Sequence, residues 1–270
     1  MSKKLDQAFQ NALNLGCQCK CGQQFVREGN SLLCPNGHRI DGNKKGYFNF
    51  LSKPVSDAYT ARLFEARSHI LNQGFFDGIL AFLLPEIREG DKILDCGTGD
   101  GYFLRSILSQ IPGSSGAGID LSRYAIEQAA DLSALWCVAD LRSLPFPDHL
   151  FDVLLDILSP ADYREFRRVL APSGKLIKVI PGREHLREIR EARKLSPVHE
   201  SLSEEHLAKE ARILRREERL KTFSINETEW QNFISMTPLN QDLTEDEQRE
   251  LAMHPSPTIT VHFVLITAAL

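Results

Sequence analysis

The segment Ile93–Tyr102 constrains the fold more than any other part of the chain. Lys92 to Leu94 has the composition of a short buried strand, and three alternate glycines follow, of which Gly97 and Gly99 are nearest the strand. After them, Tyr102 to Leu108 places apolar residues at helical spacing. The pattern predicts a strand, a glycine turn and a helix. Glycines let the backbone bend sharply and leave it open to a ligand.

Acidic residues at strand ends extend this pattern. The spacing Asp-x-Gly-x-Gly-x-Gly, which starts at Asp95, differs from the dinucleotide fingerprint G-x-G-x-x-G and resembles the first motif of class I S-adenosylmethionine-dependent methyltransferases. The next strand, Gly116 to Ile119, ends in Asp120, which is placed to bind the two hydroxyls of a ribose. Asp140 follows the third strand and is placed to accept a hydrogen bond from an adenine amino group. The alternative is a tight turn that binds nothing.

Strands and helices alternate through the rest of the chain, as in a doubly wound sheet with its ligand at the carboxyl edge of the strands. The further elements we expect are a third strand at 135–139, a fourth at 152–158, a helix at 162–170, a fifth strand at 175–180, a strand near 221–225, a helix at 227–235 and a strand at 258–268. The stretch 61–84 predicts two helices interrupted at 72–74, and the charged stretch 184–220 predicts helix. The fold class is therefore α/β, a Rossmann-like, mostly parallel seven-stranded sheet, preceded by a small N-terminal zinc-binding domain.

Length and composition fit a globular protein of one large domain with an appendage, or two domains. The chain has 270 residues, 42% of them hydrophobic and 25% charged. Its N-terminus is too polar for a signal peptide, and no apolar run could cross a bilayer. We therefore expect a cytoplasmic protein, in which clustered cysteines indicate a metal or redox chemistry rather than disulfides.

Four of the six cysteines lie within eighteen residues, at Cys17, Cys19, Cys21 and Cys34, and His38 follows. Three thiolates and an imidazole suit tetrahedral zinc, which can hold together a module too small to bury its own core. Cys21, Cys34 and His38 are expected ligands. The fourth is Cys17, with Cys19 as the alternative, because neither spacing matches the usual two residues between the first pair of ligands.

Charge separates the N-terminal part from the remainder. Residues 1–53 hold eight basic and three acidic side chains, a net charge of +5 against −9 for the rest. A basic module joined to an acidic domain is typical of a protein that contacts RNA. The alternative is that these charges form an ordinary solvated surface. The aromatics of 44–50 could stack on unpaired bases or pack the module against the large domain. We expect residues 1–53 to form a zinc-binding, RNA-contacting module with a loosely held leader at 1–16, and residues 54–270 to form the methyltransferase domain behind a linker at 54–60.

The chain resembles the bacterial 23S rRNA (guanine-N1)-methyltransferases over nearly its whole length. The motifs that carry the resemblance are Cys34-Pro-Asn-Gly-His38, Lys45-Gly-Tyr-Phe-Asn49, Glu65-Ala-Arg67, Gly74-Phe-Phe76, Leu94-Asp-Cys-Gly-Thr-Gly-Asp-Gly101, Ser159-Pro160, Lys178-Val-Ile-Pro181, His185-Leu186 and Met236-Thr-Pro238. The stretches 154–163 and 165–170 are most similar to the Gram-positive branch, which is linked to macrolide sensitivity.

The resemblance implies methyl transfer from S-adenosylmethionine to N1 of a guanine in a hairpin loop of 23S ribosomal RNA, at a position of the 745 or 748 type. It implies cofactor binding through Phe76, Gly99, Asp100 and His185. Zinc binding is implied through Cys21, Cys34, His38 and one earlier cysteine. The family is described as homodimeric. The alternatives are a methyltransferase of another RNA or of a small molecule, and a non-catalytic protein that binds S-adenosylmethionine.

Methylation of guanine N1 requires loss of its proton, which a carboxylate could accept. Asp156 and Asp162 are the candidates at the carboxyl edge of the sheet. Strand alternation could instead point Asp156 into the helix layer, and Asp162 could cap the following helix. The two candidates stay open at this point.

Overall fold

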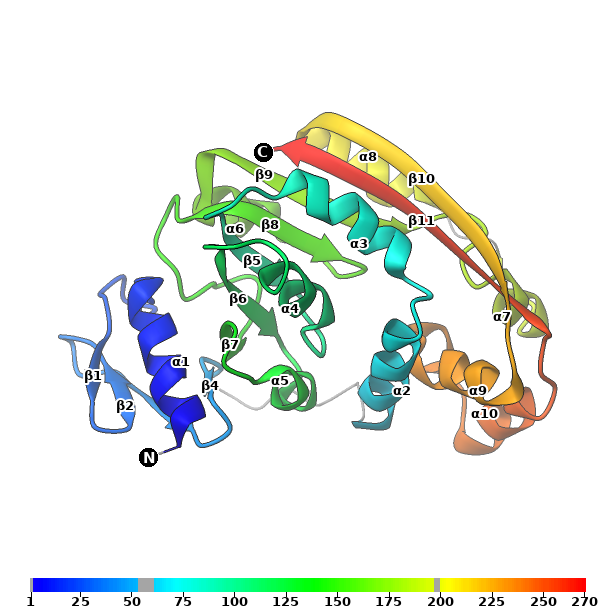
Figure 1. Ribbon diagram of the computed structural model, residues 1–270, viewed down its shortest axis with the longest axis horizontal. Coiled ribbons are helices and arrows are strands. Elements are labelled where there is room, and N and C mark those ends of the chain that lie inside the picture. The colour runs from blue at the N-terminus through cyan, green and yellow to red at the C-terminus, as the bar shows by residue number, and fades with distance from the viewer. Residues whose placement is uncertain (1, 53–60, 197–199) are drawn as a thin grey trace.

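The computed structural model describes residues 2–52, 61–196 and 200–270. In this part of the chain, one mixed sheet runs through the molecule in the order β1-β2-β3-β4-β7-β6-β5-β8-β9-β11-β10 (Figure 1). Its strands are β1 Val26–Glu28, β2 Ser31–Leu33, β3 Arg39–Asn43, β4 Tyr47–Asn49, β5 Lys92–Cys96, β6 Ser115–Asp120, β7 Leu135–Val138, β8 Phe151–Ile157, β9 Leu170–Pro181, β10 Arg212–Ser224 and β11 Thr258–Ala269.

The seven strands from β7 to β10 form the sheet expected from the sequence. Strands β7, β6, β5, β8 and β9 are parallel, β11 is antiparallel to β9, and the edge strand β10 is antiparallel to β11 and so runs in the same direction as β9. Because β5 lies between β6 and β8, the strand order reverses there, and a crevice opens at the carboxyl ends of the strands. The predicted class, a doubly wound and mostly parallel α/β sheet, is confirmed.

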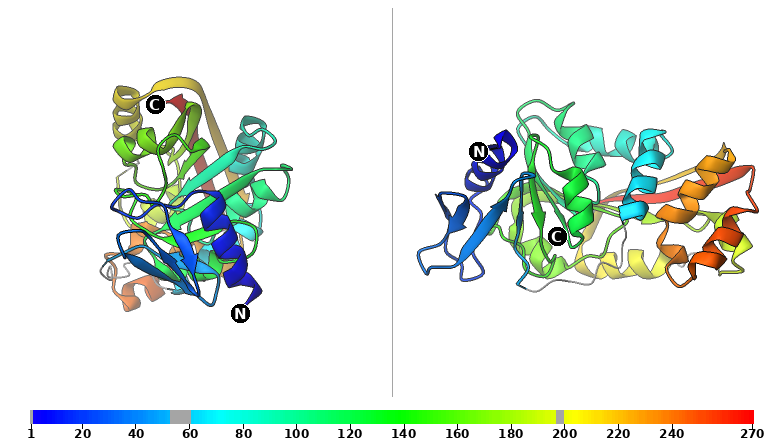
Figure 2. Two further views of the ribbon diagram at one scale, coloured as in Figure 1. Left: turned by 90° about the vertical axis from the view of Figure 1, so that its left-hand side faces the viewer. Right: turned by 90° about the horizontal axis from the view of Figure 1, so that it is seen from below.

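Helices cover both faces of this sheet (Figure 2). They are α1 Lys3–Asn14, α2 Ala61–Asn72, α3 Asp77–Leu83, α4 Tyr102–Leu108, α5 Arg123–Ala129, α6 Tyr163–Val169, α7 Arg187–Ala192, α8 Glu200–Glu210, α9 Glu227–Met236 and α10 Glu245–Ala252, with short 3-10 turns η1 Leu84–Glu86 and η2 Pro238–Asn240. The core on one face includes α3, α4, α5 and α9, and the core on the other includes α1 and α6. Alternate strand residues feed the two cores: Ile93 belongs to the first and Leu94 to the second. Within the described residues, no helix is long and apolar enough to cross a membrane.

The N-terminal part is joined to the sheet more tightly than its composition indicates. The sequence predicts a hairpin here, with short strands at 24–26 and 31–33 around Glu28-Gly29-Asn30. It is present as β1 and β2, and β4 pairs in parallel with β7 through Phe48 and Cys137. The prediction of a loosely held leader is wrong, because α1 buries Leu5 and Phe9 in the core shared with the large domain. The close packing extends to Gly42, where a Cβ atom would lie 2.5 Å from the side chain of Leu5. The predicted linker at 54–60 lies outside the described residues.

The aromatics beside the lysines pack inward. Tyr47, Phe48 and Phe50 are buried, and the rings of Phe9 and Phe48 meet edge to face with centroids 5.1 Å apart. These rings therefore hold the N-terminal elements against the large domain. The interpretation that they stack on unpaired bases is wrong for this structure.

The charged stretch at 184–220 is helical only in part. Helices α7 and α8 are followed by β10, an edge strand that pairs with β11 along its length. Its charges pair at a spacing of two residues, as in Arg216 with Glu218 at 2.7 Å. Residues i and i+2 share one face of a strand, whereas helical pairs lie three or four apart. The prediction of helix up to residue 220 failed because a high content of charged residues is compatible with both a strand and a helix.

Candidate functional site

The three glycines of the turn after β5 all have positive φ, and two of them make room for distant side chains. A Cβ atom on Gly97 would lie 2.5 Å from Cβ of Ser159, and one on Gly101 would lie 2.5 Å from the ring of Trp136. Gly99 has φ of 59° and faces Arg67 at 3.7 Å. The turn therefore requires glycine both for its backbone and for the close approach of other segments.

A cavity of about 540 Å³ opens at this turn, at the carboxyl ends of the central strands. It collects residues from α2, the glycine turn, the loops after β6, β7 and β8, and the end of α9. Its lining residues are Leu63, Phe64, Arg67, Gly97, Gly99, Asp120, Leu121, Asp140, Leu141, Arg142, Leu158, Ser159, Pro160, Ala161, Asp162, Met236 and Pro238. The cavity is mostly apolar and lies where the strand order reverses. Its volume is suited to a nucleoside-sized ligand.

Asp120 braces the glycine turn and lines the cavity. One carboxylate oxygen accepts a hydrogen bond from the Gly99 amide at 3.0 Å, and the other accepts from the Ser122 amide at 2.8 Å. A carboxylate can accept several hydrogen bonds at once, including bonds from hydroxyl donors. This position fits the predicted contact with a ribose.

Asp140 also lines the cavity, but its own loop already supplies donors. Arg142 approaches it with Nη2 2.6 Å from Oδ2, and the Arg142 amide donates at 2.9 Å. The hydrogen bond from Arg142 lowers the pKa of the Asp140 carboxyl, which keeps it ionised. The predicted contact with an adenine amino group stays a prediction.

Asp100 offers a test of whether a charged ligand fits here. Its side chain is 2% exposed, and Oδ2 has no hydrogen-bond partner among the described residues, while Oδ1 accepts from the Tyr102 amide at 3.3 Å. Burial of an unpartnered carboxylate oxygen costs free energy unless a donor supplies the missing bond. Asp100 does not line the cavity, but it lies in the glycine turn beside it, so its unpartnered oxygen fits a ligand at this turn that carries an amino group or hydroxyls, as S-adenosylmethionine does.

Phe76 and His185 lie together but do not line the cavity. Both are buried, their ring centroids are 6.2 Å apart, and Phe263 packs against each of them. Burial lowers the pKa of His185 to about 3, so the imidazole is neutral, and the His262 amide lies 3.3 Å from Nδ1. Their implied role in cofactor binding stays a prediction, and in this structure they form part of the core.

The two candidate general bases differ in access. The Asp156 side chain has no exposed surface, pairs with the buried Lys178, and does not line the cavity. Direct contact between Asp156 and a substrate base is therefore excluded in this structure. Asp162 lines the cavity and caps α6, accepting from the Glu165 amide at 3.0 Å.

Several residues that line the cavity were not predicted as site residues from the sequence patterns. Leu63, Phe64 and Arg67 reach the site from α2, and Met236 and Pro238 reach it from the end of α9. Arg67, Met236 and Pro238 occur in motifs that carried the family resemblance, which is a signal that they matter. Helical periodicity could not show that these faces meet the sheet edge, because that contact depends on the packing of α2 against α9.

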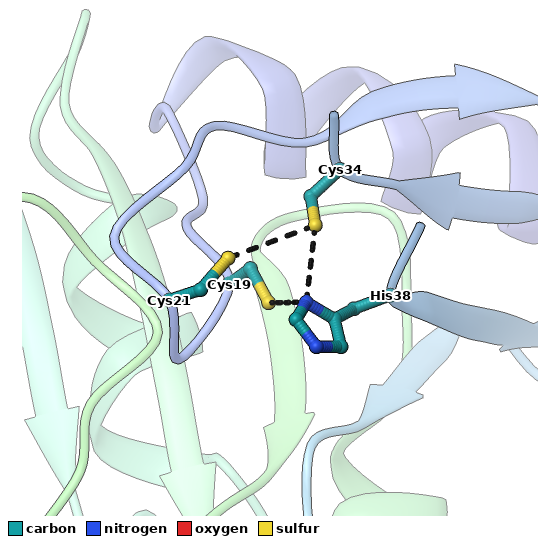
Figure 3. Close-up of side chains that lie close together, drawn as sticks. All are labelled: Cys19, Cys21, Cys34 and His38. Carbon is teal, nitrogen blue, oxygen red and sulfur yellow. Dashed lines mark hydrogen bonds between the residues drawn. The ribbon is translucent and has the colours of Figure 1, made fainter. Parts of the chain in front are cut away.

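A second cluster lies in the N-terminal part, where Cys19, Cys21, Cys34 and His38 place their ligand atoms within 4.8 Å of one another (Figure 3). Sγ of Cys21 and Sγ of Cys34 are 3.7 Å apart, and Nδ1 of His38 lies 3.3 Å from Sγ of Cys19. Zn–S bonds of about 2.3 Å at tetrahedral angles place sulfur atoms roughly 3.8 Å apart. The donor set and its geometry therefore fit zinc.

The fourth member of the cluster is Cys19, the alternative predicted ligand, and Cys17, the preferred one, lies outside the cluster. Cys17 continues from α1, with its amide donating to the Ala12 carbonyl at 2.9 Å, and its side chain is buried in the core. Burial raises the pKa of the Cys17 thiol far above its usual range. The close spacing of Cys19 and Cys21 is allowed by Gly22, which turns the chain with φ of 79°. The pKa of the Cys21 thiol is lowered to about 6, and the largest cause is the hydrogen bond that it accepts from the backbone N–H of Gln23.

The metal cluster and the cavity are linked through the backbone. The Gln18 amide donates to the Pro145 carbonyl at 3.0 Å, in the loop that carries Asp140 and Arg142. The Lys20 ammonium is close enough to lower the pKa of the Asp140 carboxyl. The loop of the metal cluster and the rim of the cavity therefore form neighbouring surfaces.

Comparison with known proteins shows which proteins this chain is similar to. Residues 93–174 match the family model described as a methyltransferase domain. Bacillus subtilis YxjB, provisionally named a 23S rRNA (guanine-N(1)-)-methyltransferase, is 42% identical over 176 residues, which cover 60% of this chain and 62% of YxjB. The 23S rRNA (guanine(748)-N(1))-methyltransferase of Streptomyces fradiae is 30% identical over 182 residues, covering 64% and 65%. The matches span less than two thirds of the length of these curated relatives.

Solved structures share the fold. A chain from the complex of the Haloferax volcanii Trm112 methyltransferase activator with a methyltransferase superposes with a TM-score of 0.50 at 19% identity, over 81% of this chain and 99% of that one. Phosphoethanolamine N-methyltransferase 2 of Haemonchus contortus, in complex with S-adenosyl-L-methionine, gives a TM-score of 0.50 at 18% identity, over 79% and 58%. With the glycine turn, these matches show that the chain has the fold of these methyltransferases, and its sequence is similar to that of the 23S rRNA (guanine-N1)-methyltransferases.

Proposed function

We propose that the chain transfers a methyl group from S-adenosylmethionine to N1 of a guanine in a hairpin loop of 23S ribosomal RNA. The observation that carries this proposal is the similarity to YxjB and to the Streptomyces fradiae enzyme, whose names state methylation of guanine N1 in 23S ribosomal RNA. The cavity at the glycine turn supports it, because its size and acidic residues suit the cofactor. Modification at position 748 is supported by the name of one relative at 30% identity.

The cofactor supplies an electrophilic methyl group, so the protein mainly aligns the acceptor nitrogen with it. Gly97 and Gly99 leave the backbone open to the cofactor, and Asp120 is placed for its ribose. The apolar side of the cavity, which includes Phe64 and Met236, suits a flat base. A guanine can reach this depth only when it is unstacked, which favours a loop of the RNA.

The basic residues near the cavity suit a polyanion. Lys20 lies in the loop of the metal cluster, Arg142 is at the cavity rim, and Lys44 is exposed on the N-terminal part. We propose that residues 1–53 contribute RNA contacts in this way, and that residues 54–270 carry the catalytic site. Zinc at Cys19, Cys21, Cys34 and His38 would hold that loop in place. The homodimer, the cytoplasmic location and the link to macrolide sensitivity stay predictions.

Methyl transfer from labelled S-adenosylmethionine tests the proposal. The substrate is 23S ribosomal RNA from a strain that lacks the gene, with RNA from the parent strain as the control that is already modified. We expect one methyl group per RNA, and mass spectrometry of nuclease fragments should locate it at N1 of a guanine in a hairpin loop. Labelling of another RNA or of small molecules, with the ribosomal RNA unlabelled, would contradict the proposal.

A further inference from the structure

A network of buried polar groups connects the cavity with Asp156. Ser159 lines the cavity, and its Oγ lies 2.7 Å from Oδ1 of Asp156 and 2.7 Å from the carbonyl oxygen of Cys96. Lys178 pairs with the other carboxylate oxygen of Asp156, and both of these side chains are buried. Ser159 is thus the group through which a fully buried carboxylate meets the cavity.

The position of Ser159 is determined by two separate features. Gly97 has no side chain, and any Cβ there would meet both Cβ and Oγ of Ser159 below 3 Å. Leu158, directly before it, is a non-glycine residue with φ of 55°, a left-handed conformation that costs about 1–2 kcal/mol. Such strain persists where surrounding structure enforces it, and it commonly occurs at functional sites. The strained step turns Ser159 toward the glycine turn, where the methyl donor would bind.

We propose that Ser159 accepts the N1 proton of the target guanine and passes its own hydroxyl proton to Asp156. This inference rests on the proposed function and gives the route by which the proton on N1 of the guanine leaves. Asp156 acts through Ser159 and positions it, and Ser159 is the group that touches the base.

The step balances without any further reagent. The N1–H bond breaks, its proton goes to Oγ of Ser159, and the Ser159 hydroxyl proton goes to Oδ1 of Asp156. The electron pair left on N1 forms the bond to the methyl carbon, and the pair of the breaking methyl–sulfur bond stays on sulfur. The proton held by Asp156 returns through Ser159 to water after the product leaves.

The two equal distances around Ser159 support both ends of this transfer. A hydroxyl donates one hydrogen bond at a time, so beforehand Ser159 donates to the ionised Asp156. Afterwards the protonated Asp156 donates to Oγ, and Ser159 can turn its proton to the Cys96 carbonyl at the same 2.7 Å. Both states are fully hydrogen-bonded, which avoids the cost of an unpartnered buried group. Burial raises the pKa of Asp156 while the ion pair with Lys178 opposes that rise, and a raised pKa makes the carboxylate a better proton acceptor.

The pH dependence of Ser159→Ala tests the relay. This variant removes one oxygen and keeps the Cβ atom already present, so it should fold, and calorimetry should show cofactor affinity close to that of the parent. In single-turnover methylation of protein-free 23S ribosomal RNA with excess enzyme, we expect a rate about 100-fold lower at neutral pH, the scale of general-base catalysis. The defect should shrink as the pH rises into the mildly alkaline range, because N1 of guanine then ionises without a base.

Asp162→Asn provides the comparison, since Asn can keep the helix cap and removes the carboxylate of the other candidate base, which lines the cavity. It should keep the pH profile of the parent. A parent-like rate for Ser159→Ala, or a defect that is the same at every pH, would overturn the relay. Alkaline rescue of Asp162→Asn in place of Ser159→Ala would also overturn it and make Asp162 the base. A parent protein that does not methylate the RNA would instead refute the proposed function itself.

Discussion

The metal cluster and the cofactor cavity are built in opposite ways. The four ligands of the cluster come from Cys19 to His38, and short turns bring them together. The cavity draws its lining from Leu63 to Pro238, through six separate segments that meet only because the sheet is assembled. The first is a local site on the surface of the fold, and the second exists only in the complete fold. Substitutions in the two sites should therefore fail in different ways.

The largest effect should follow loss of a metal ligand. Cys34→Ser is expected to lower bound zinc from about one equivalent per chain to near zero, because zinc sites of this kind require all four ligands for tight binding. Cys19→Ser should do the same. Elemental analysis of purified protein measures both. Cys17→Ser is the matched control: it should keep its zinc, and loss of zinc from Cys17→Ser but not from Cys19→Ser would reverse the ligand assignment.

Gly97→Ala should produce the next largest effect, because it breaks a contact between distant segments. The left-handed backbone and the overlap with Ser159 together should lower the free energy of unfolding by about 2–5 kcal/mol. Gly90→Ala is the control, since its φ is 82° but a Cβ atom there would meet nothing within 4 Å. It should cost about 1–2 kcal/mol. Urea unfolding measures both, and equal costs would mean that the Ser159 contact is unimportant.

Asp120→Ala should weaken binding of S-adenosylmethionine by about 1.5–3 kcal/mol, the usual contribution of hydrogen bonds to a charged group. Calorimetry on the folded variant gives the affinity. Asp120→Asn separates the two roles of this residue, because an amide can still accept from one backbone N–H while it lacks the charge. Unchanged affinity in both variants would show that Asp120 braces the turn without contacting the ligand.

The smallest effect should come from the exposed surface. Lys44→Glu is expected to weaken binding of the ribosomal RNA by less than about tenfold and to lower the slope of its salt dependence by roughly one. Filter binding over a range of salt concentrations measures both quantities. Lys209→Glu on α8 makes the same charge change away from the N-terminal part and should leave the slope unaltered. Equal effects of the two variants would mean that only net charge matters.

Point substitutions are preferable to truncation for this comparison. Removing residues 1–53 would take away β4 and α1, which would open the edge of β7 and uncover the core that contains Phe48 and Cys137. An unpaired edge and an exposed apolar face promote aggregation. Loss of activity after truncation would therefore not separate RNA contact from folding.

The sequence by itself determined the features that depend on neighbouring residues. The strand, glycine turn and helix from Lys92 to Leu108 are present as β5 and α4, and the seven-stranded sheet follows the expected order of elements. The short hairpin of β1 and β2 and the broken helix at 61–84 were also predicted. Local spacing sufficed for these elements because turn chemistry and apolar periodicity act within a few residues.

Only the tertiary structure decided which way particular side chains point. Cys17 and Cys19 are two residues apart, yet the first is buried against the sheet and the second reaches the metal cluster. Asp156 belongs to the correct strand for a base but is buried beneath Ser159, and the charges of β10 pair across a strand instead of along a helix. The reason in each case is the same: exposure depends on segments far away in the chain, and packing energy that outweighs local preference is gained only when those segments meet.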